Sequence, residues 1–133
     1  MTKERLRDYR AIVHETKTLE RQMETIETAL YHPKVPKLRN TPKAAGSSRT
    51  TEDLAARHQA LLELYRGKLG RMAEELLAIE QAIDRLPARE RTILRRYYLE
   101  GMTWEEVCVA EHYSWRQVHR IHARALERLR EEE

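Results

Sequence analysis

The strongest constraint on the fold is a narrow apolar stripe that repeats in steps of three and four over two long segments. Within residues 4–31 it runs through Tyr9, Ile12, Thr16, Leu19, Met23, Ile26 and Leu30. It resumes after Thr51 and runs through Leu54, His58, Leu61, Tyr65, Lys68, Met72, Leu76, Ile79, Ile83 and Leu86. Such steps place side chains on one helix face, as in the seam of a coiled coil. Because a helix with one bare apolar stripe needs a partner, the two segments predict an antiparallel helical hairpin.

The segment between the two stripes, residues 32–50, is predicted to be a flexible connector. It holds three prolines and one glycine, and all its charged residues are basic. The alternative is an arm that binds DNA, which the all-basic charge would favour. Two glycines in the second stripe segment, Gly67 and Gly70, raise a separate question. They either allow another helix to approach closely or weaken their own helix.

Composition favours an all-α protein without a membrane span. Phe is absent, glycine and proline number four each, and 35% of residues are charged. The single cysteine, Cys108, excludes an internal disulfide, so we expect a reducing, cytoplasmic location. The charged N-terminus lacks the apolar core of a signal peptide, and no apolar run approaches the ~18 residues of a membrane span.

The C-terminal part, residues 86–133, carries the signals of a helix-turn-helix. Pro87 fits the first turn of a helix, and Gly101 is a suitable stop for it. Two capping boxes follow, Thr103 with Glu106 and Ser114 with Gln117, and each predicts the start of a further helix. Two capped helices this close, with apolar residues between them, form a helix-turn-helix. We therefore expect two domains, with the hairpin covering residues 1–85.

The second capped helix has no acid before Glu127. Arg116, Arg120 and Arg124 recur every four residues on its outer side and form a ridge. DNA is densely negative, so a helix that enters the major groove must avoid carboxylates there, and an arginine can bind guanine with both arms of its guanidinium. This pattern favours DNA binding. The alternative is an ordinary solvated helix whose acids fall elsewhere.

Residues 86–130 resemble the region-four module of bacterial sigma factors, which reads a promoter element. The resemblance is carried by L-P-x-R-E-R, by the helix end L-x-x-x-Y-x-x-G, by T-x-E-E-V, and by Y-S-x-x-x-V-x-x-I-x-x-x-A-L-x-x-L-R. It implies that the groove-facing residues are Trp115, Arg116, His119 and Arg120. It further places Gln117 near a phosphate at the helix N-terminus and lets Arg124 continue the ridge towards the DNA backbone.

Two features depart from the sigma pattern. Glu111 and His112 stand where sigma factors usually have leucine and glycine, so the turn between the helices is altered. Trp115 is bulky at a usually polar position. It either contacts DNA bases, stacks on a sugar, or clamps the helix against a neighbour. Nothing else in the chain resembles the sigma segment that melts DNA.

The layout of helical N-terminal half, basic connector and region-four-like C-terminus resembles small phage and prophage regulators of the ArpU and RinA type. Some of these activate late or packaging genes, so the resemblance implies a transcriptional regulator that binds double-stranded DNA. The bare seams favour a homodimer through the hairpin, and contact with RNA polymerase is left open. The alternative is a small terminase subunit, a phage packaging protein that also joins a helix-turn-helix to an oligomerising hairpin.

We expect no enzyme activity, cofactor or metal. The spacings of His119 with His122 and of Cys108 with His112 invite a zinc site. However, the first pair belongs to the predicted recognition helix and the second straddles the turn. Cys108 takes a position where sigma-like modules carry alanine, and it is expected to be a small buried apolar residue. No glycine-rich phosphate loop, paired buried carboxylates or Ser-His-Asp arrangement is visible.

Overall fold

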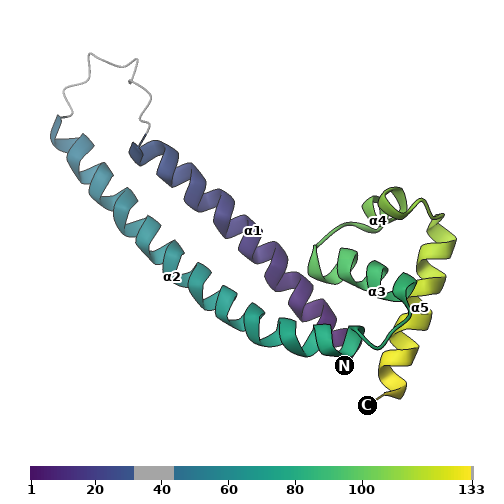
Figure 1. Ribbon diagram of the computed structural model, residues 1–133. Coiled ribbons are helices and arrows are strands. Elements are labelled where there is room, and N and C mark those ends of the chain that lie inside the picture. The colour runs from purple at the N-terminus through teal and green to yellow at the C-terminus, as the bar shows by residue number, and fades with distance from the viewer. Residues whose placement is uncertain (32–43, 133) are drawn as a thin grey trace. The chain divides into compact units, whose positions relative to one another are not determined.

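The computed structural model describes residues 1–31 and 44–132, which form helices joined by short turns (Figure 1). The elements are α1 (Lys3–Tyr31), α2 (Ala44–Ile83), α3 (Ala88–Leu94), a π-helical turn η1 (Arg95–Leu99), α4 (Trp104–Glu111) and α5 (Trp115–Glu131). The long helices α1 and α2 lie side by side and run in opposite directions. The predicted all-α fold, a long hairpin followed by a small helical bundle, is confirmed. None of the helices in the described ranges is long and apolar enough to cross a membrane.

The second long helix begins earlier than the sequence pattern predicts. Its first residue is Ala44, whereas the prolines and basic residues predict a connector through residue 50. Once a helix has formed, each added residue contributes a hydrogen bond at little cost. The helix therefore extends back through the alanine- and serine-bearing residues that precede Thr51. Residues 32–43, the rest of the predicted connector, lie outside the described residues.

The chain divides into two compact units. The first combines Met1–Glu15 with Gly70–Glu133, and the second is Thr16–Leu69. The first unit thus holds the beginning of α1 and the end of α2 together with all the C-terminal helices. The ends of both long helices therefore share a core with the C-terminal helices. The expected domain boundary between residues 85 and 86 stays a prediction.

In the second unit, α1 and α2 are joined along the predicted seam. The buried residues of α1 in this unit are Thr16, Leu19 and Met23. Polar contacts flank the seam. The Tyr65 hydroxyl donates to Glu20 Oε1 at 2.6 Å, and His58 Nε2 lies 2.8 Å from Glu27 Oε1. These pairs define an antiparallel register. Glu27 follows Glu20 in α1, whereas its partner His58 precedes Tyr65 in α2.

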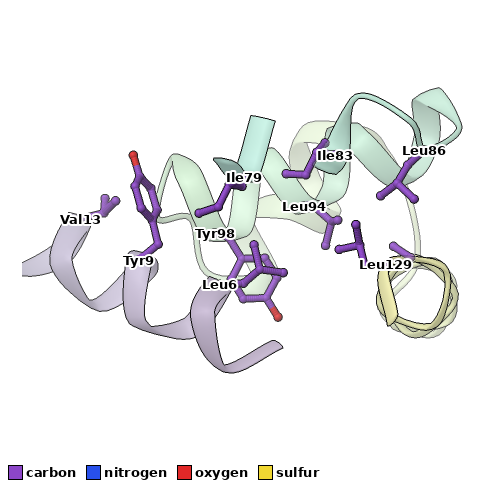
Figure 2. Packing of buried hydrophobic residues seen from close by; sticks show 10 residues of the cluster. Leu6, Tyr9, Val13, Ile79, Ile83, Leu86, Leu94, Tyr98 and Leu129 are labelled. Carbon is purple, nitrogen blue, oxygen red and sulfur yellow. The ribbon is translucent and has the colours of Figure 1, made fainter. Parts of the chain in front are cut away.

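The core of the first unit forms where the ends of the hairpin helices meet the C-terminal helices (Figure 2). Its buried residues are Leu6, Tyr9, Val13, Ile79, Ile83, Leu86, Leu94, Tyr98, Ala125 and Leu129. Full burial of a side chain of this size stabilises the fold by about 1.5–3 kcal/mol. Leu6 and Val13 lie outside the predicted stripe. They widen the apolar face of α1, because this part of α1 packs on more than one helix.

The C-terminal helices form the predicted helix-turn-helix, and both predicted capping boxes are present. The side chains of Thr103 and Ser114 accept hydrogen bonds from the backbone N–H groups of Glu106 and Gln117. The Glu106 and Gln117 side chains accept from the cap residues' own N–H groups in return. A second apolar cluster holds the helices together; its buried residues are Ile93, Val107, Val118 and Ile121, and Cys108 is partly buried against it.

Residues with left-handed backbone end η1 and α4. Gly101 has a φ of 76°, as expected of a helix stop, and His112 has a φ of 57°. This conformation costs a residue with a side chain roughly 1–2 kcal/mol. The turn before α5 therefore has a backbone that favours glycine, although histidine occupies it. The neighbouring Glu111 accepts an ion-paired hydrogen bond from Arg96.

A buried polar pair lies inside the first unit. The Tyr98 hydroxyl and His122 Nε2 are hydrogen-bonded at 2.7 Å, and the two residues are 1% and 9% exposed. Burial, together with the charges of Lys3, His119 and Arg7, lowers the pKa of His122 to about 4. Burial also raises the pKa of Tyr98 to about 12. Both side chains are therefore neutral near pH 7.

The low pKa of His122 predicts a pH-dependent stability. The folded state holds His122 neutral, whereas the unfolded chain protonates it below its ordinary pKa of 6.5. The stability that the protein gains by keeping His122 neutral is complete above that pKa, and it is lost as the pH falls towards about 4. Between about pH 7.5 and pH 5, the free energy of unfolding of the wild type should fall by roughly 2 kcal/mol more than that of a double variant, His122→Leu with Tyr98→Phe. Urea unfolding at the two pH values measures this difference. Equal losses in both proteins would refute this assignment.

The two glycines of α2 give a second prediction. A Cβ added at Gly67 or Gly70 would meet no atom within 4 Å. Gly67→Ala and Gly70→Ala should therefore each stabilise the protein by up to ~1 kcal/mol, because alanine favours the helix. Thermal melts followed by circular dichroism measure this, with Ala73→Gly, at an exposed position of the same helix, as the reverse control. Destabilisation by either alanine would instead indicate that a second chain packs on that glycine.

Candidate nucleic-acid interface

Most of the sequence-predicted DNA-contacting residues lie on the exposed side of α5. The exposed ones are Trp115, Arg116, Gln117, Arg120 and Arg124, while His119 is half-buried. The opposite side of the helix carries the core residues Val118, Ile121, His122, Ala125 and Leu129. Because the arginines recur every four residues, they share the solvent-facing side. The predicted ridge is therefore physically available to an extended anionic partner.

The N-terminus of α5 is also suited to a phosphate. Helix N-termini present unpaired N–H groups and the positive end of the helix dipole. Gln117 lies in this first turn, and its Oε1 accepts from the Ser114 backbone N–H at 2.9 Å. The capping box thus engages the amide oxygen of Gln117. Its amide nitrogen is the group that can donate to a phosphate.

His119 and Trp115 belong to a cluster of aromatic rings. The His119 ring centroid lies 4.9 Å from that of Trp104 and 4.4 Å from that of Trp115. The Nε2 atom of His119 is buried and has no hydrogen-bond partner among the described residues. That nitrogen is therefore shielded from solvent. Trp115 packs on His119 and still remains 52% exposed, so it contacts a neighbour and leaves about half of its surface open to a ligand.

Two arginines that the sequence pattern did not single out, Arg89 and Arg128, extend the ridge. Arg120 and Arg124 line a hollow of about 390 Å³ together with Arg128 and with Arg89 of α3. Glu90 lies in the same wall and is 4% exposed; its Oε1 accepts from Arg128 Nε at 3.1 Å. One carboxylate among four arginines leaves the hollow positive, as a phosphate site requires.

The sequence held a partial signal for this hollow. Arg89 and Glu90 are the R-E of the L-P-x-R-E-R motif. The motif predicts a helix start, and only the packing of α3 on α5 shows that these residues lie beside the ridge. Glu90 Oε2 is buried and has no partner among the described residues. A buried carboxylate is costly without partners, so the surrounding arginines are needed to keep it in place.

A residue of α1 also contacts the helix-turn-helix. Arg10 donates from Nε to the Tyr97 carbonyl and from a terminal guanidinium nitrogen to the Met102 carbonyl, both at 3.0 Å. Its guanidinium carbon lies 4.0 Å from the centroid of the Tyr97 ring. No local pattern marks Arg10 for this role, because its partners are 87 and 92 positions away in the chain.

The zinc-like spacings do not build a metal centre in the part of the chain that the structure describes. No three His, Cys, Asp or Glu side chains gather there in a group that could hold an ion. His122 is instead hydrogen-bonded to Tyr98, and Cys108 is partly buried against an apolar cluster.

Comparison with known proteins bears on both parts of the chain. Residues 82–131 match the family model described as Sigma-70, region 4. Over 112 residues the chain is 30% identical to the transcriptional activator RinA of Staphylococcus phage phi11, covering 84% of this chain and 78% of that protein. No solved structure matches the chain significantly.

These matches indicate a DNA-binding transcriptional regulator, a class of protein without enzymatic activity. The geometry agrees, since the matched region contains the helix-turn-helix with its arginine ridge. The C-terminal part is a DNA-binding domain of the sigma-70 region 4 type, and the chain belongs, as a distant member, to the family of the phage transcriptional activator RinA.

Proposed function

We propose that this protein is a phage or prophage transcriptional regulator of the late-gene activator type, which binds a specific double-stranded DNA sequence in the bacterial cytoplasm or nucleoid. The observation that carries the proposal is the exposed, acid-free arginine ridge of α5 within a helix-turn-helix of the sigma type. The likeness to a named transcriptional activator supports the regulatory role.

We assign the residues of α5 by their distance from the helix N-terminus. Recognition helices contact bases mainly with their N-terminal residues. Arg116 and Arg120 therefore read base edges in the major groove. Arg124 lies a further turn along the ridge, next to the positive hollow, and contacts the phosphate backbone. Trp115 and His119 form the edge of the reading surface.

Base reading and charge can be separated by two arginine variants. Arg120→Ala should cost roughly 1–3 kcal/mol on the preferred site and relax specificity at one or two base pairs. Arg124→Ala should weaken binding to all sequences about equally and lower the salt slope by about one unit. The measurement is binding at several salt concentrations to a duplex that the wild type selects from a random pool and to its scrambled version.

Val118→Asp serves as the structural control for this experiment. Val118 is fully buried, so the aspartate should unfold the helix-turn-helix and circular dichroism should register the loss. If both arginine variants stay folded and bind every duplex as the wild type does, the ridge is only a solvated face and the DNA-reading proposal fails.

The hairpin is proposed to form a homodimer. Several leucines of α2 are exposed: Leu64, Leu69, Leu76 and Leu77. Leu76 and Leu77 are neighbours in the sequence, and adjoining exposed apolar side chains favour contact with another chain. Light scattering should show a mass that rises with concentration to that of a dimer, and Leu77→Glu should lower it. A monomer at high concentration would contradict the dimer. A ring of many subunits would favour the alternative, a small terminase subunit.

For the role of a late-gene activator, we also propose that this protein contacts RNA polymerase. Mapping of the bound sites across a host genome separates the roles: sites upstream of lysis or packaging genes support activation. A single site within a terminase gene would support packaging instead. Pull-down with polymerase core enzyme then tests the contact directly.

A further inference from the structure

A continuous column of contacting side chains, one guanidinium and four rings, connects α1 to the exposed end of α5. The Arg10 guanidinium lies over the Tyr97 ring at 4.0 Å. Tyr97 stacks on Trp104 with ring centroids 3.8 Å apart and an interplanar angle of 10°. Trp104 contacts His119 at 4.9 Å, and His119 contacts Trp115 at 4.4 Å. All five groups belong to the first compact unit.

Arg10 also fixes the backbone that carries this column. Its two hydrogen bonds go to the carbonyls of Tyr97 and Met102, which flank the turn at Gly101. This turn joins η1 to the capped start of α4, where Trp104 is the first helical residue. A forked guanidinium that bonds two carbonyls and stacks on a ring holds all of them in one geometry. The position of Trp104 therefore depends on a residue of α1.

The far end of the column depends on ring packing. His119 Nε2 is buried without a hydrogen-bond partner among the described residues, so no hydrogen bond from that atom orients the ring. The contacts with Trp104 and Trp115 orient it instead. Its neighbours along α5 are Trp115, which is 52% exposed, and the exposed Arg116 and Arg120. A shift of Trp104 would therefore move side chains at the DNA-reading end of α5.

We propose that Arg10 is a positioning residue for DNA recognition, which acts through Tyr97 and Trp104 on His119 and Trp115. The inference rests on the proposed function of α5. It means that α1 contributes to sequence specificity without touching DNA. The experiment must separate this positioning role from two others. One is a direct contact of Arg10 with a phosphate, and the other is a contribution of Arg10 to stability alone.

The experiment uses the full-length protein with the selected and scrambled duplexes described above. Arg10→Ala removes both the hydrogen bonds and the stacking, and Arg10→Lys keeps the charge but not the planar fork. Arg7→Ala is the matched control, since Arg7 is an exposed arginine of the same helix and its loss changes the net charge equally. Trp104→Leu breaks the column while leaving Arg10 in place. Far-ultraviolet circular dichroism checks that each variant is folded.

We expect Arg10→Ala and Arg10→Lys to weaken binding to the selected duplex about three- to tenfold, within the range of about two- to thirtyfold that indirect coupling residues produce. Binding to the scrambled duplex should stay within about twofold, and the salt slope should not change, because no phosphate contact is lost. Trp104→Leu should reproduce the loss of selectivity, and Arg7→Ala should not. The near-ultraviolet circular dichroism of the stacked Tyr97 and Trp104 rings should fall in both Arg10 variants.

Three results would overturn the inference. One is an Arg10→Ala variant that is folded and keeps the wild-type ratio of affinities for the two duplexes. Another is an equal loss on both duplexes with a salt slope lower by about one unit, which would make Arg10 a phosphate contact. The third result applies if Arg10→Ala does not fold. Folded Arg10→Lys and Trp104→Leu variants that keep the wild-type ratio of affinities would then contradict the inference. Failure of the wild type itself to prefer any duplex would instead refute the proposed function, and that result comes from the wild-type protein alone.

Discussion

Burial of one apolar core between the hairpin ends and the C-terminal helices supports the rest of this structure. Leu6 of α1 and Ile79 and Ile83 of α2 are fully buried there, together with Leu94 and Tyr98. Each such side chain contributes about 1.5–3 kcal/mol by leaving water. The ends of the long helices therefore cannot leave the helix-turn-helix without exposing this surface, and the first compact unit holds both hairpin ends together with the helix-turn-helix.

The polar contacts of the first unit act on this apolar framework. The neutral pair of Tyr98 and His122 ties η1 to α5 inside the core. On one side of α5, Arg128 pairs with the buried Glu90 of α3. Hydrogen-bonded polar groups that are buried specify one arrangement, because any other leaves them without partners. A rigid α5 is what the proposed base-reading ridge requires, since a misplaced helix would not place its side chains against the base edges.

The parts of the fold that were predicted correctly depend on residues close in sequence. The apolar steps of three and four define the helices, and the two capping boxes mark the starts of α4 and α5. The sequence pattern predicts a later start for α2 than the structure shows, because the favourable propagation of a helix outweighs weak local propensity. The exposed ridge of Arg116, Arg120 and Arg124 follows from the same local periodicity. His119 is half-buried, which periodicity alone does not indicate.

The sequence by itself determined the helices, their caps and the acid-free ridge, because each follows from interactions within about one helical turn. The tertiary structure alone decided which helices share a core, and so where the two compact units divide. It also decided the positive hollow around Glu90 and the contact of Arg10 with Tyr97. These features join residues tens of positions apart, and such contacts depend on how whole helices pack rather than on any local pattern of residues.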